Sequence, residues 1–419
     1  MASKVSTKIA LLAGVAAVSA GYASAQASFY ERNRYVSVTE RAQPEYDSVP
    51  IRLGAFEARP AVYVGAGYRT NLFASSTNET EDSYLLLRPT VNLQSTWSRH
   101  SLAVSLSSET TEYNDTSSES STDLRGRISG RVDASSTASL VGNVIAENIH
   151  EPRSSVASNP AAVEPVEYSR LGGEVGADYV AGRVKIRGRL SSESFDYEDV
   201  RLNAGPMLDQ DFRDRDETSA NVRVAYAPQR DWAVFVEGIV TERDYDAPVA
   251  PSTLNRDSQD TVIRVGSDFE LPFLVRGDVA VGYFQTEFDD SAFGDIDGLS
   301  VAANASWFVT QLTTVTGSAS RSVVDPGLQT AAGATQTDVS VRVDHELRRN
   351  WLINATLGMS DYDYENINRT DERIRVRLGT EWKLNRNASL NASYDYFDQD
   401  SNQQPFSENR VLVGVTLRP

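Results

Sequence analysis

The chain has 419 residues, a formal net charge of −18 at pH 7 and no cysteine. Its acidity argues against a nucleic-acid partner, and the lack of cysteine excludes a disulfide framework, a thiolate metal site and a thiol nucleophile. The mean hydropathy of −0.38 resembles that of a water-soluble protein. It does not exclude a membrane β-barrel, because only alternate residues of barrel strands face lipid.

Residues 1–25 have the pattern of a secretory signal peptide. Basic residues precede an apolar run over 9–20, and the small residues 23–25 fit a cleavage site before Gln26. The run is too short to cross a bilayer as a helix, and no later segment approaches ~20 continuous apolar residues. We therefore expect an exported chain without a membrane helix. Residues 26–59 are polar and show no periodicity, and we interpret them as a periplasmic N-terminal extension.

From residue 60 onward, apolar and polar residues alternate. Leu124, Ile128 and Val132 interleave with arginines, and Val184 and Ile186 interleave with further basic residues. A period of two with one apolar and one polar face predicts β-strands. A soluble β-sandwich would show the same alternation, so the pattern alone leaves both folds open.

The connections between the predicted strands alternate between short and long. Short turns such as 98–100 and 348–350 alternate with long acidic segments such as 150–166 and 198–217. Short periplasmic turns and long outer loops are typical of a transmembrane barrel with both chain ends in the periplasm. We therefore predict an all-β fold, an antiparallel up-and-down transmembrane β-barrel over 60–419 with about eighteen strands, and about sixteen as the alternative count. The expected spans are 60–73, 83–98, 101–113, 122–133, 137–149, 167–180, 182–197, 218–227, 232–246, 259–271, 274–288, 296–308, 312–323, 337–347, 351–364, 372–384, 388–398 and 408–418.

Aromatic residues favour the membrane alternative. Two aromatic girdles are expected at the two interfaces of a barrel, because the rings prefer apolar contact while their polar tips prefer water. In a soluble sandwich, tryptophan would instead cap the core. All five tryptophans stand beside short turns: Trp97, Trp232, Trp307, Trp351 and Trp382. Residues at the long-loop ends include Tyr113, Phe195, Tyr197, Tyr245, Phe288, Tyr362, Tyr364, Tyr396 and Phe397.

The last predicted strand reaches the C-terminus. Val411, Val413, Val415 and Leu417 occupy alternate positions up to Arg418 and Pro419. This end looks like an outer-membrane assembly signal, although the signal usually ends in Phe and this chain ends in Pro419.

Several short motifs occur in order along the chain. They are Arg41-x-x-Pro44-Glu45-Tyr46-Asp47, Ile51-Arg52-Leu53-Gly54-Ala55-Phe56, Gly67-Tyr68-Arg69-Thr70-Asn71-Leu72-Phe73 and Tyr394-Asp395-Tyr396-Phe397-Asp398. Together they resemble the putative β-barrel porin 2 family over nearly the whole mature chain, with Thr70 where the family commonly has Asp. The resemblance implies an outer-membrane channel associated with exopolysaccharide or capsule export, and it implies no catalytic residues.

If the apolar members of each strand face lipid, the polar members line the lumen. Arginine forks there could bind carboxylates in bidentate fashion and set the selectivity of the pore. Alternatively, they could pair with acids across strands and hold the register. The strongest candidates lie over 183–189 and 373–377, where several like charges share one face. The predicted pore-lining residues are Arg125, Arg127, Arg131, Arg183, Lys185, Arg187, Arg189, Arg342, Arg373, Arg375 and Arg377.

Metal binding and catalysis are not predicted. Asp295-x-Asp297 and Asp361-x-Asp363-x-Glu365 have the spacing of oxygen ligands, but neither completes a calcium-binding loop, and we interpret both as solvated loops.

The three histidines do not suggest a catalytic site. His100 is expected in a periplasmic turn, His345 on the lipid-facing side and His150 at the start of an outer loop. No spacing suggests a nucleophile with its base. We expect no enzyme and no cofactor.

Three functions remain open. The first is a passive conduit for polysaccharide export, working with a periplasmic export partner through residues 26–59. The second is a general or sugar-selective diffusion porin, with the loop at 198–217 folded inward as a constriction. The third is a structural or adhesive barrel. In each case we expect the cell outer membrane of a Gram-negative bacterium, with lipid and lipopolysaccharide around the wall.

Overall fold

The computed structural model describes residues 36–203, 205, 207–249, 254–272 and 274–419. The predicted signal peptide and the first part of the predicted extension lie outside these residues. Among the described helices, none is long and apolar enough to cross a membrane.

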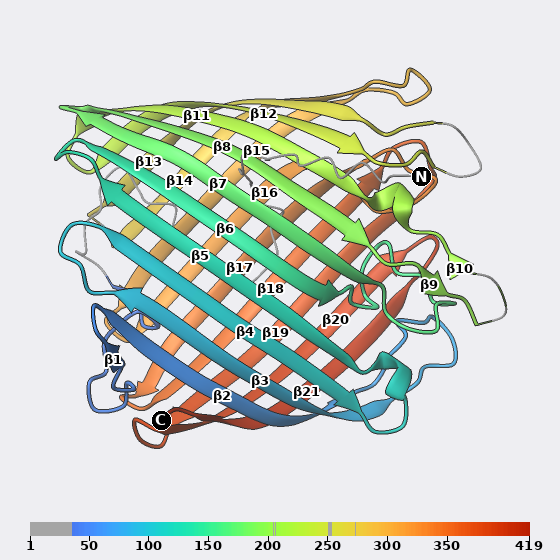
Figure 1. Cartoon of the computed structure of the whole chain (residues 1–419), viewed down its shortest axis with the longest axis horizontal. Coiled ribbons are helices and arrows are strands. Elements are labelled where there is room, and N and C mark those ends of the chain that lie inside the picture. The colour runs from blue at the N-terminus through green and yellow to red at the C-terminus, as the bar shows by residue number, and fades with distance from the viewer. Residues whose placement is uncertain (1–35, 204, 206, 250–253, 273) are drawn as a thin grey trace, which may run out of the picture.

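The described chain forms a closed antiparallel barrel (Figure 1). Each barrel strand pairs with the next one along the chain, and the last strand, β21, pairs with the first, β2, over Val62–Arg69. The barrel has eighteen strands, so the predicted fold and count are confirmed and the alternative of sixteen is wrong. They are β2 (Phe56–Arg69), β3 (Asp82–Ser95), β4 (Ser101–Tyr113), β5 (Ser121–Asp133), β6 (Ala138–His150), β7 (Glu167–Ala181), β8 (Val184–Tyr197), β11 (Arg215–Gln229), β12 (Trp232–Tyr245), β13 (Ser258–Leu271), β14 (Val275–Phe288), β15 (Ile296–Thr310), β16 (Thr313–Val324), β17 (Ala334–Arg348), β18 (Trp351–Tyr364), β19 (Thr370–Lys383), β20 (Ala388–Ser401) and β21 (Phe406–Leu417).

The first strand is displaced from its predicted span of 60–73. β2 begins at Phe56, because the short strand β1 (Ile51–Leu53) folds back onto residues 56–58 through Gly54, whose φ of +62° suits glycine. It ends at Arg69. After it, the Asn71 side chain bonds the carbonyls of Ser75 and Ser407, and this holds the chain in a loop.

Side chains alternate between the two faces of the wall. Leu124, Ile128 and Val132 of β5 point outward and remain about half exposed, at 52%, 48% and 51%. Arg125 and Arg131 of the same strand point inward. The wall therefore has an apolar outer face and a polar lumen, which is the arrangement expected of a membrane barrel.

Every tryptophan stands at a short-turn end, as predicted. Trp232 opens β12 and Trp351 opens β18, while Trp307 and Trp382 lie near the ends of β15 and β19. The rings of Trp351 and Trp382 lie 6.2 Å apart, and a belt of this kind suits a membrane interface.

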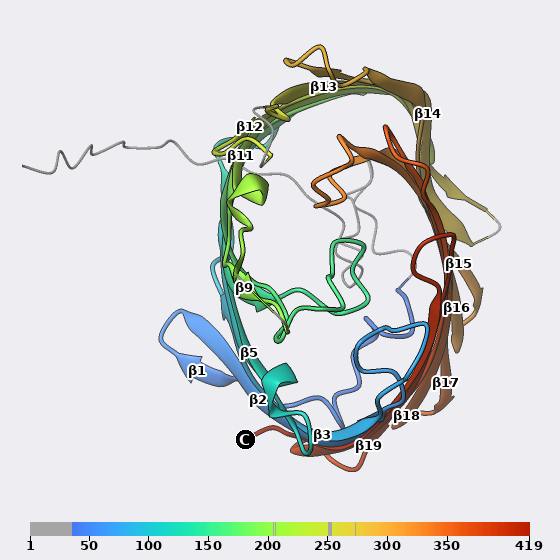
Figure 2. The same ribbon diagram turned by 90° about the vertical axis from the view of Figure 1, so that its right-hand side faces the viewer.

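Residues 36–50 run along the short-turn rim of the barrel. The backbone N–H of Val38, which is 1% exposed, donates to Thr314 Oγ1. Arg41 pairs with Glu346 at 3.4 Å, and Asp47 pairs with Lys383 at 3.1 Å. The hairpin of β1 then projects outside the barrel outline (Figure 2).

Candidate channel lumen

The lumen has two walls that differ in charge. On the first wall, arginines form ion pairs with acidic side chains, and on the second wall fewer arginines do so. The first extends over β6 to β13. On it, Arg170 bonds Glu193 at 2.7 Å, and Arg189 bonds Asp178 at 2.6 Å. Arg223 completes the row by pairing with Glu237 at 3.0 Å. Neighbouring opposite charges cancel most of each other's field, so this wall offers little net charge to a passing ion.

The second wall is centred on β19, which is nine strands from β8 in either direction around the barrel. Arg373, Arg375 and Arg377 stand in a row on its inner face. Arg377 bonds Asp395 at 2.5 Å, whereas the guanidiniums of Arg373 and Arg375 lie over the rings of Tyr362 and Phe397, at 4.9 and 5.2 Å from the ring centroids. Within the described residues, no carboxylate forms an ion pair with Arg373 or Arg375.

Short hydroxyl side chains adjoin this arginine row on β15 to β18. The hydroxyls of Ser318 and Ser340 lie 2.7 Å apart, and Ser360 donates to Asp338. The hydroxyls of Ser306 and Thr316 lie 3.4 Å apart. Because these side chains are small, this part of the wall reaches less far into the lumen than the salt-bridged wall does.

At the long-loop end, two loops from opposite sides of the barrel meet across the lumen. Val156 of the 151–166 loop packs against a buried cluster that includes Ala331 of the 325–333 loop, and Leu328 of that loop packs against the same cluster. A Cβ placed on Gly327 would lie only 2.8 Å from the Cβ of Ala157. Figure 2 looks onto this end and shows the 151–166 loop, in green, reaching the middle of the barrel. These two loops bridge the lumen at the long-loop end, which we call the outer mouth.

Asp325 anchors the 325–333 loop, one of the two loops that meet across the lumen. Its carboxylate pairs with Arg256 at 2.9 Å, accepts a hydrogen bond from Tyr245 Oη at 3.0 Å, and lies 3.6 Å from Arg215. Burial by itself would raise the pKa of Asp325, but the guanidiniums of Arg256 and Arg215 and the N–H of Gly327 hold it well below its usual range. The Asp325 side chain is therefore an anion fixed among cations.

The loop at 198–217, which the sequence suggested as the constriction, has a supporting place instead. Its first part forms the small hairpin of β9 (Val200–Arg201) and β10 (Met207–Leu208), and Leu202 bridges to Ala162 of the 151–166 loop. From the 3-10 turn η2 (Asp211–Arg213), Arg213 pairs with Glu151 at 2.8 Å. This loop braces the 151–166 loop, and the 151–166 loop crosses the lumen.

The predicted pore-lining residues are distributed unevenly. Arg125, Arg131 and Arg342 each pair with an acid two residues away on the same strand. Arg127 is exposed, and Lys185 is largely buried at 9%. These residues lie on the inner face together with Arg187 and Arg189, which both approach Asp178.

Arg183 is a correction to that prediction. It lies in the turn before β8, where its guanidinium donates to the carbonyl of Pro228. The strand begins at Val184, two residues later than expected, so this side chain does not extend the basic row along the wall.

Comparison with known proteins places the chain in a family. The family model of putative beta-barrel porin 2 matches residues 43–419. The chain belongs to that family. No match is found among curated proteins. The solved structures to which it is similar include Pseudomonas aeruginosa OccK2 (OpdF), with 12% identity, a TM-score of 0.46, and 86% of this chain and 98% of that chain covered.

Two further solved structures show the same level of likeness. The outer membrane protein opdK from Pseudomonas aeruginosa has 11% identity and a TM-score of 0.44, with 86% and 99% of the two chains covered. The copper transporter OprC has 11% identity and a TM-score of 0.45, with 88% and 81% covered. Both likenesses concern the barrel fold alone.

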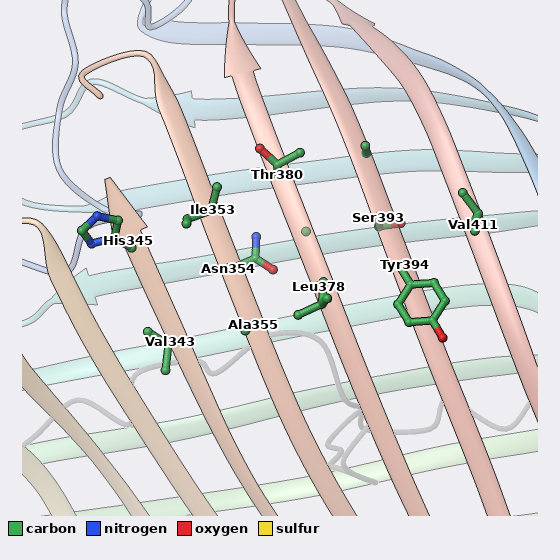
Figure 3. A pocket seen from close by; sticks show the side chains of 12 residues that line it. Val343, His345, Ile353, Asn354, Ala355, Leu378, Thr380, Ser393, Tyr394 and Val411 are labelled. Atoms are coloured by element: carbon green, nitrogen blue, oxygen red, sulfur yellow. The ribbon is translucent and has the colours of Figure 1, made fainter. Parts of the chain in front are cut away.

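The porin wall also carries an apolar hollow, but on its outer face. It measures about 560 Å³ and is lined by Val343, Ile353, Leu378 and Tyr394, with His345 at its edge (Figure 3). His345 lies on the outward face, as expected, and its Nδ1 is 2.9 Å from the hydroxyl of Thr313. The hollow lies in the apolar band, where lipid covers the wall, and does not open into the lumen.

One group of acidic side chains in this porin lies close together, away from the two acidic segments that the sequence analysis interpreted as solvated loops. Among the described residues, the carboxylates close enough to share an ion are those of Asp199, Asp209 and Asp211, not those of the two segments singled out for their spacing. All three are exposed, and the N–H of Gln210 already bonds Asp199. We assign no metal to them.

Sequence reasoning missed Asp325 and Arg256, the residues that fasten the bridge. They lie in separate loops, and no local pattern connects them. The ion pairs of Arg125, Arg131 and Arg342 could have been predicted from the sequence, since an acid two positions away lies on the same face of a strand.

Proposed function

We propose that this porin is a passive diffusion channel for small hydrophilic solutes, with a preference for anions, in the outer membrane of a Gram-negative bacterium. The observation that carries the proposal is a closed barrel with a polar lumen, crossed at one end by the loop of Val156, which packs on the cluster around Ala331. One side of that lumen is lined by Arg373 and Arg375, which form no ion pair within the described residues. Barrels of sixteen to eighteen strands leave an aqueous channel, and rings of arginine favour anions.

We infer diffusion rather than polysaccharide export, which the sequence suggested first. A polymer passing through the outer mouth would have to displace the 151–166 and 325–333 loops. Those loops are fastened by apolar packing and by the ion pairs of Arg256 and Arg213. Small solutes require no such displacement. Export through a periplasmic partner stays a prediction from the family resemblance.

Selectivity would come from the side chains at the wall. An anion entering past the loops meets the β19 row, where Arg373 and Arg375 offer positive charge and, in the part of the chain that the structure describes, form no ion pair. The opposite wall, with Asp178 and Glu237 paired to arginines, neither strongly attracts nor repels it. Transport would follow the concentration gradient.

Planar-bilayer recording of the refolded chain tests this proposal. We expect stepwise single-channel currents and a reversal potential showing anion preference in a salt gradient. The double substitution Arg375→Glu/Arg377→Glu should abolish that preference while leaving channels open. Arg183→Glu, in the turn, serves as the matched control and should change it little. Absence of any conductance in a correctly folded barrel would overturn the proposal and favour a structural or adhesive barrel.

A further inference from the structure

We propose that Arg375 and the hydroxyl-lined shelf beside it form a binding site for small polyhydroxylated oxyanions, with an anionic head group and a hydroxyl-bearing body. The proposal rests on the proposed function, because such a solute reaches the site only if the lumen is open to it. Beyond anion preference, we assign one binding site on the wall and the class of solute that this site binds.

The site begins with a gap in the wall. Arg375 lies between Phe397 of β20 and Gly358 of β18, which are its direct partners across the two neighbouring strands. The guanidinium leans over the Phe397 ring at 5.2 Å. On the other flank, a Cβ built on Gly358 would meet no heavy atom within 4 Å. One edge of the guanidinium is thus covered by an aromatic ring, and the other faces empty space.

The floor beyond this gap is made of hydroxyls. The same register row continues from Gly358 to Ser340 and then to Ser318, whose hydroxyls lie 2.7 Å apart. The row above contains Ser360, whose hydroxyl donates to Asp338, and the row below contains Thr356. These two are the register partners of Arg373 and Arg377. Hydroxyls both donate and accept hydrogen bonds, so they complement the hydroxyl groups of a polyol.

Arg375 differs from other arginines of the lumen in its ion pairing. Arg377 is paired with Asp395, and Arg342 is paired with Asp344. Within the described residues, Arg375 has no ion pair, although Arg373 and Arg377 stand on either side of it on the same face. A guanidinium in this position binds an oxyanion by charge-assisted hydrogen bonds, which are stronger than neutral ones. The hydroxyl floor then holds the remainder of the solute.

Equilibrium binding to the full barrel, refolded in detergent, tests the site without requiring conduction. Isothermal titration calorimetry would use D-gluconate and glycerol 3-phosphate as the two oxyanion probes and sorbitol as the uncharged polyol. We expect binding of at least one oxyanion and at least about tenfold weaker binding of sorbitol, since a hydrogen bond to a charged group contributes about 1.5–3 kcal/mol. The difference between the two oxyanions reveals whether carboxylate or phosphate is preferred.

Two variants locate the binding. Arg375→Gln removes the charge, and Gly358→Val fills the gap with a residue suited to a strand; each should weaken oxyanion binding about tenfold or more. Arg127→Gln removes an exposed inner arginine on β5 and is the matched control. Equal binding of sorbitol and the oxyanions, or equal weakening by Arg127→Gln, would overturn the site.

The two proposals fail in distinguishable ways. A chain that binds gluconate at Arg375 but carries no current would retain the site and lose the diffusion channel. A chain that conducts anions but binds neither oxyanion would retain the channel and lose the site. Circular dichroism and heat-modifiable electrophoretic migration confirm that each variant has folded.

Discussion

The carboxylate of Asp325 and the guanidinium of Arg256 lie 2.9 Å apart and join two outer loops that are separated by four barrel strands. Arg256 also donates to the backbone carbonyl of Phe212, so a third loop is tied to the same point. At this point the outer mouth is fastened.

Asp325→Asn should loosen the mouth. The substitution leaves the buried guanidinium of Arg256 without its anion, and breaking one partner of a buried pair costs about 3–5 kcal/mol. We expect the 325–333 loop to become cleavable by added protease and single-channel current noise to rise. Asp290→Asn, in an exposed loop, is the control. Equal protease resistance of wild type and Asp325→Asn would show that the pair does not hold the loop.

Shortening the 151–166 loop should widen the mouth. Deletion of residues 155–158 removes Val156 and Ala157, which contact the opposite loop. We expect the single-channel conductance to rise roughly twofold, because a hydrophobic constriction limits ion flow. An equivalent deletion within the 289–295 loop should leave the conductance unchanged. If both deletions behave alike, the constriction lies elsewhere.

Asp214 should make the 198–214 loop sensitive to pH. Burial and the nearby carboxylates of Asp196, Asp211 and Asp246 raise its pKa to about 6, although its bond from the Tyr197 N–H acts in the opposite direction. A raised folded-state pKa favours the protonated form. Its contribution to loop stability is therefore present below the unfolded pKa and is lost as pH rises through about 6.

Hydrogen exchange of the 198–214 amides, corrected for intrinsic rates, measures this effect. Protection should fall between pH 4.5 and pH 7 in wild type and should be nearly flat across that window in Asp214→Asn. Asp325 acts in another window: its lowered pKa means that its contribution is lost only as pH falls below the usual aspartate range. A pH-independent wild type would contradict the assignment to Asp214.

A charge placed on the outer face should destabilise the barrel. Val236 points outward from the middle of β12 and is 55% exposed. Val236→Arg would put a cation in the apolar band, which costs about 2–4 kcal/mol near the bilayer midplane. Ser320→Arg, on the inner face, should fold with little loss. Urea unfolding in lipid vesicles compares the two, and equal stability would argue against the assigned faces.

The strands were predictable because each face is read from alternate residues. Leu124, Ile128 and Val132 define an outer face with no knowledge of the neighbouring strands. The ends of strands were harder, since β2 begins where β1 folds back on it and ends where Asn71 bonds Ser407 across the closure. Those contacts depend on residues far away in the sequence.

The candidate site was only partly predictable. The sequence places Arg375 on an inner face, but it does not reveal that Gly358 and Phe397 are its neighbours, because register depends on the turns between strands. It also cannot join Asp325 to Arg256, which lie in separate loops. The bridge over the mouth results from packing between loops, and no periodic pattern encodes it.

The closure of the barrel has a consequence for its width. β21 pairs with β2 over eight residues, whereas β3 pairs with the same strand over fourteen. A slip of β21 by two residues along β2 would alter the shear of the barrel and hence its diameter. Such a slip toward the short turns would bring Pro419 opposite Ala58, and that position is already taken by Ile51 of β1. By occupying that position, the three-residue strand β1 would block the slip of β21 sterically and so keep the pore diameter constant.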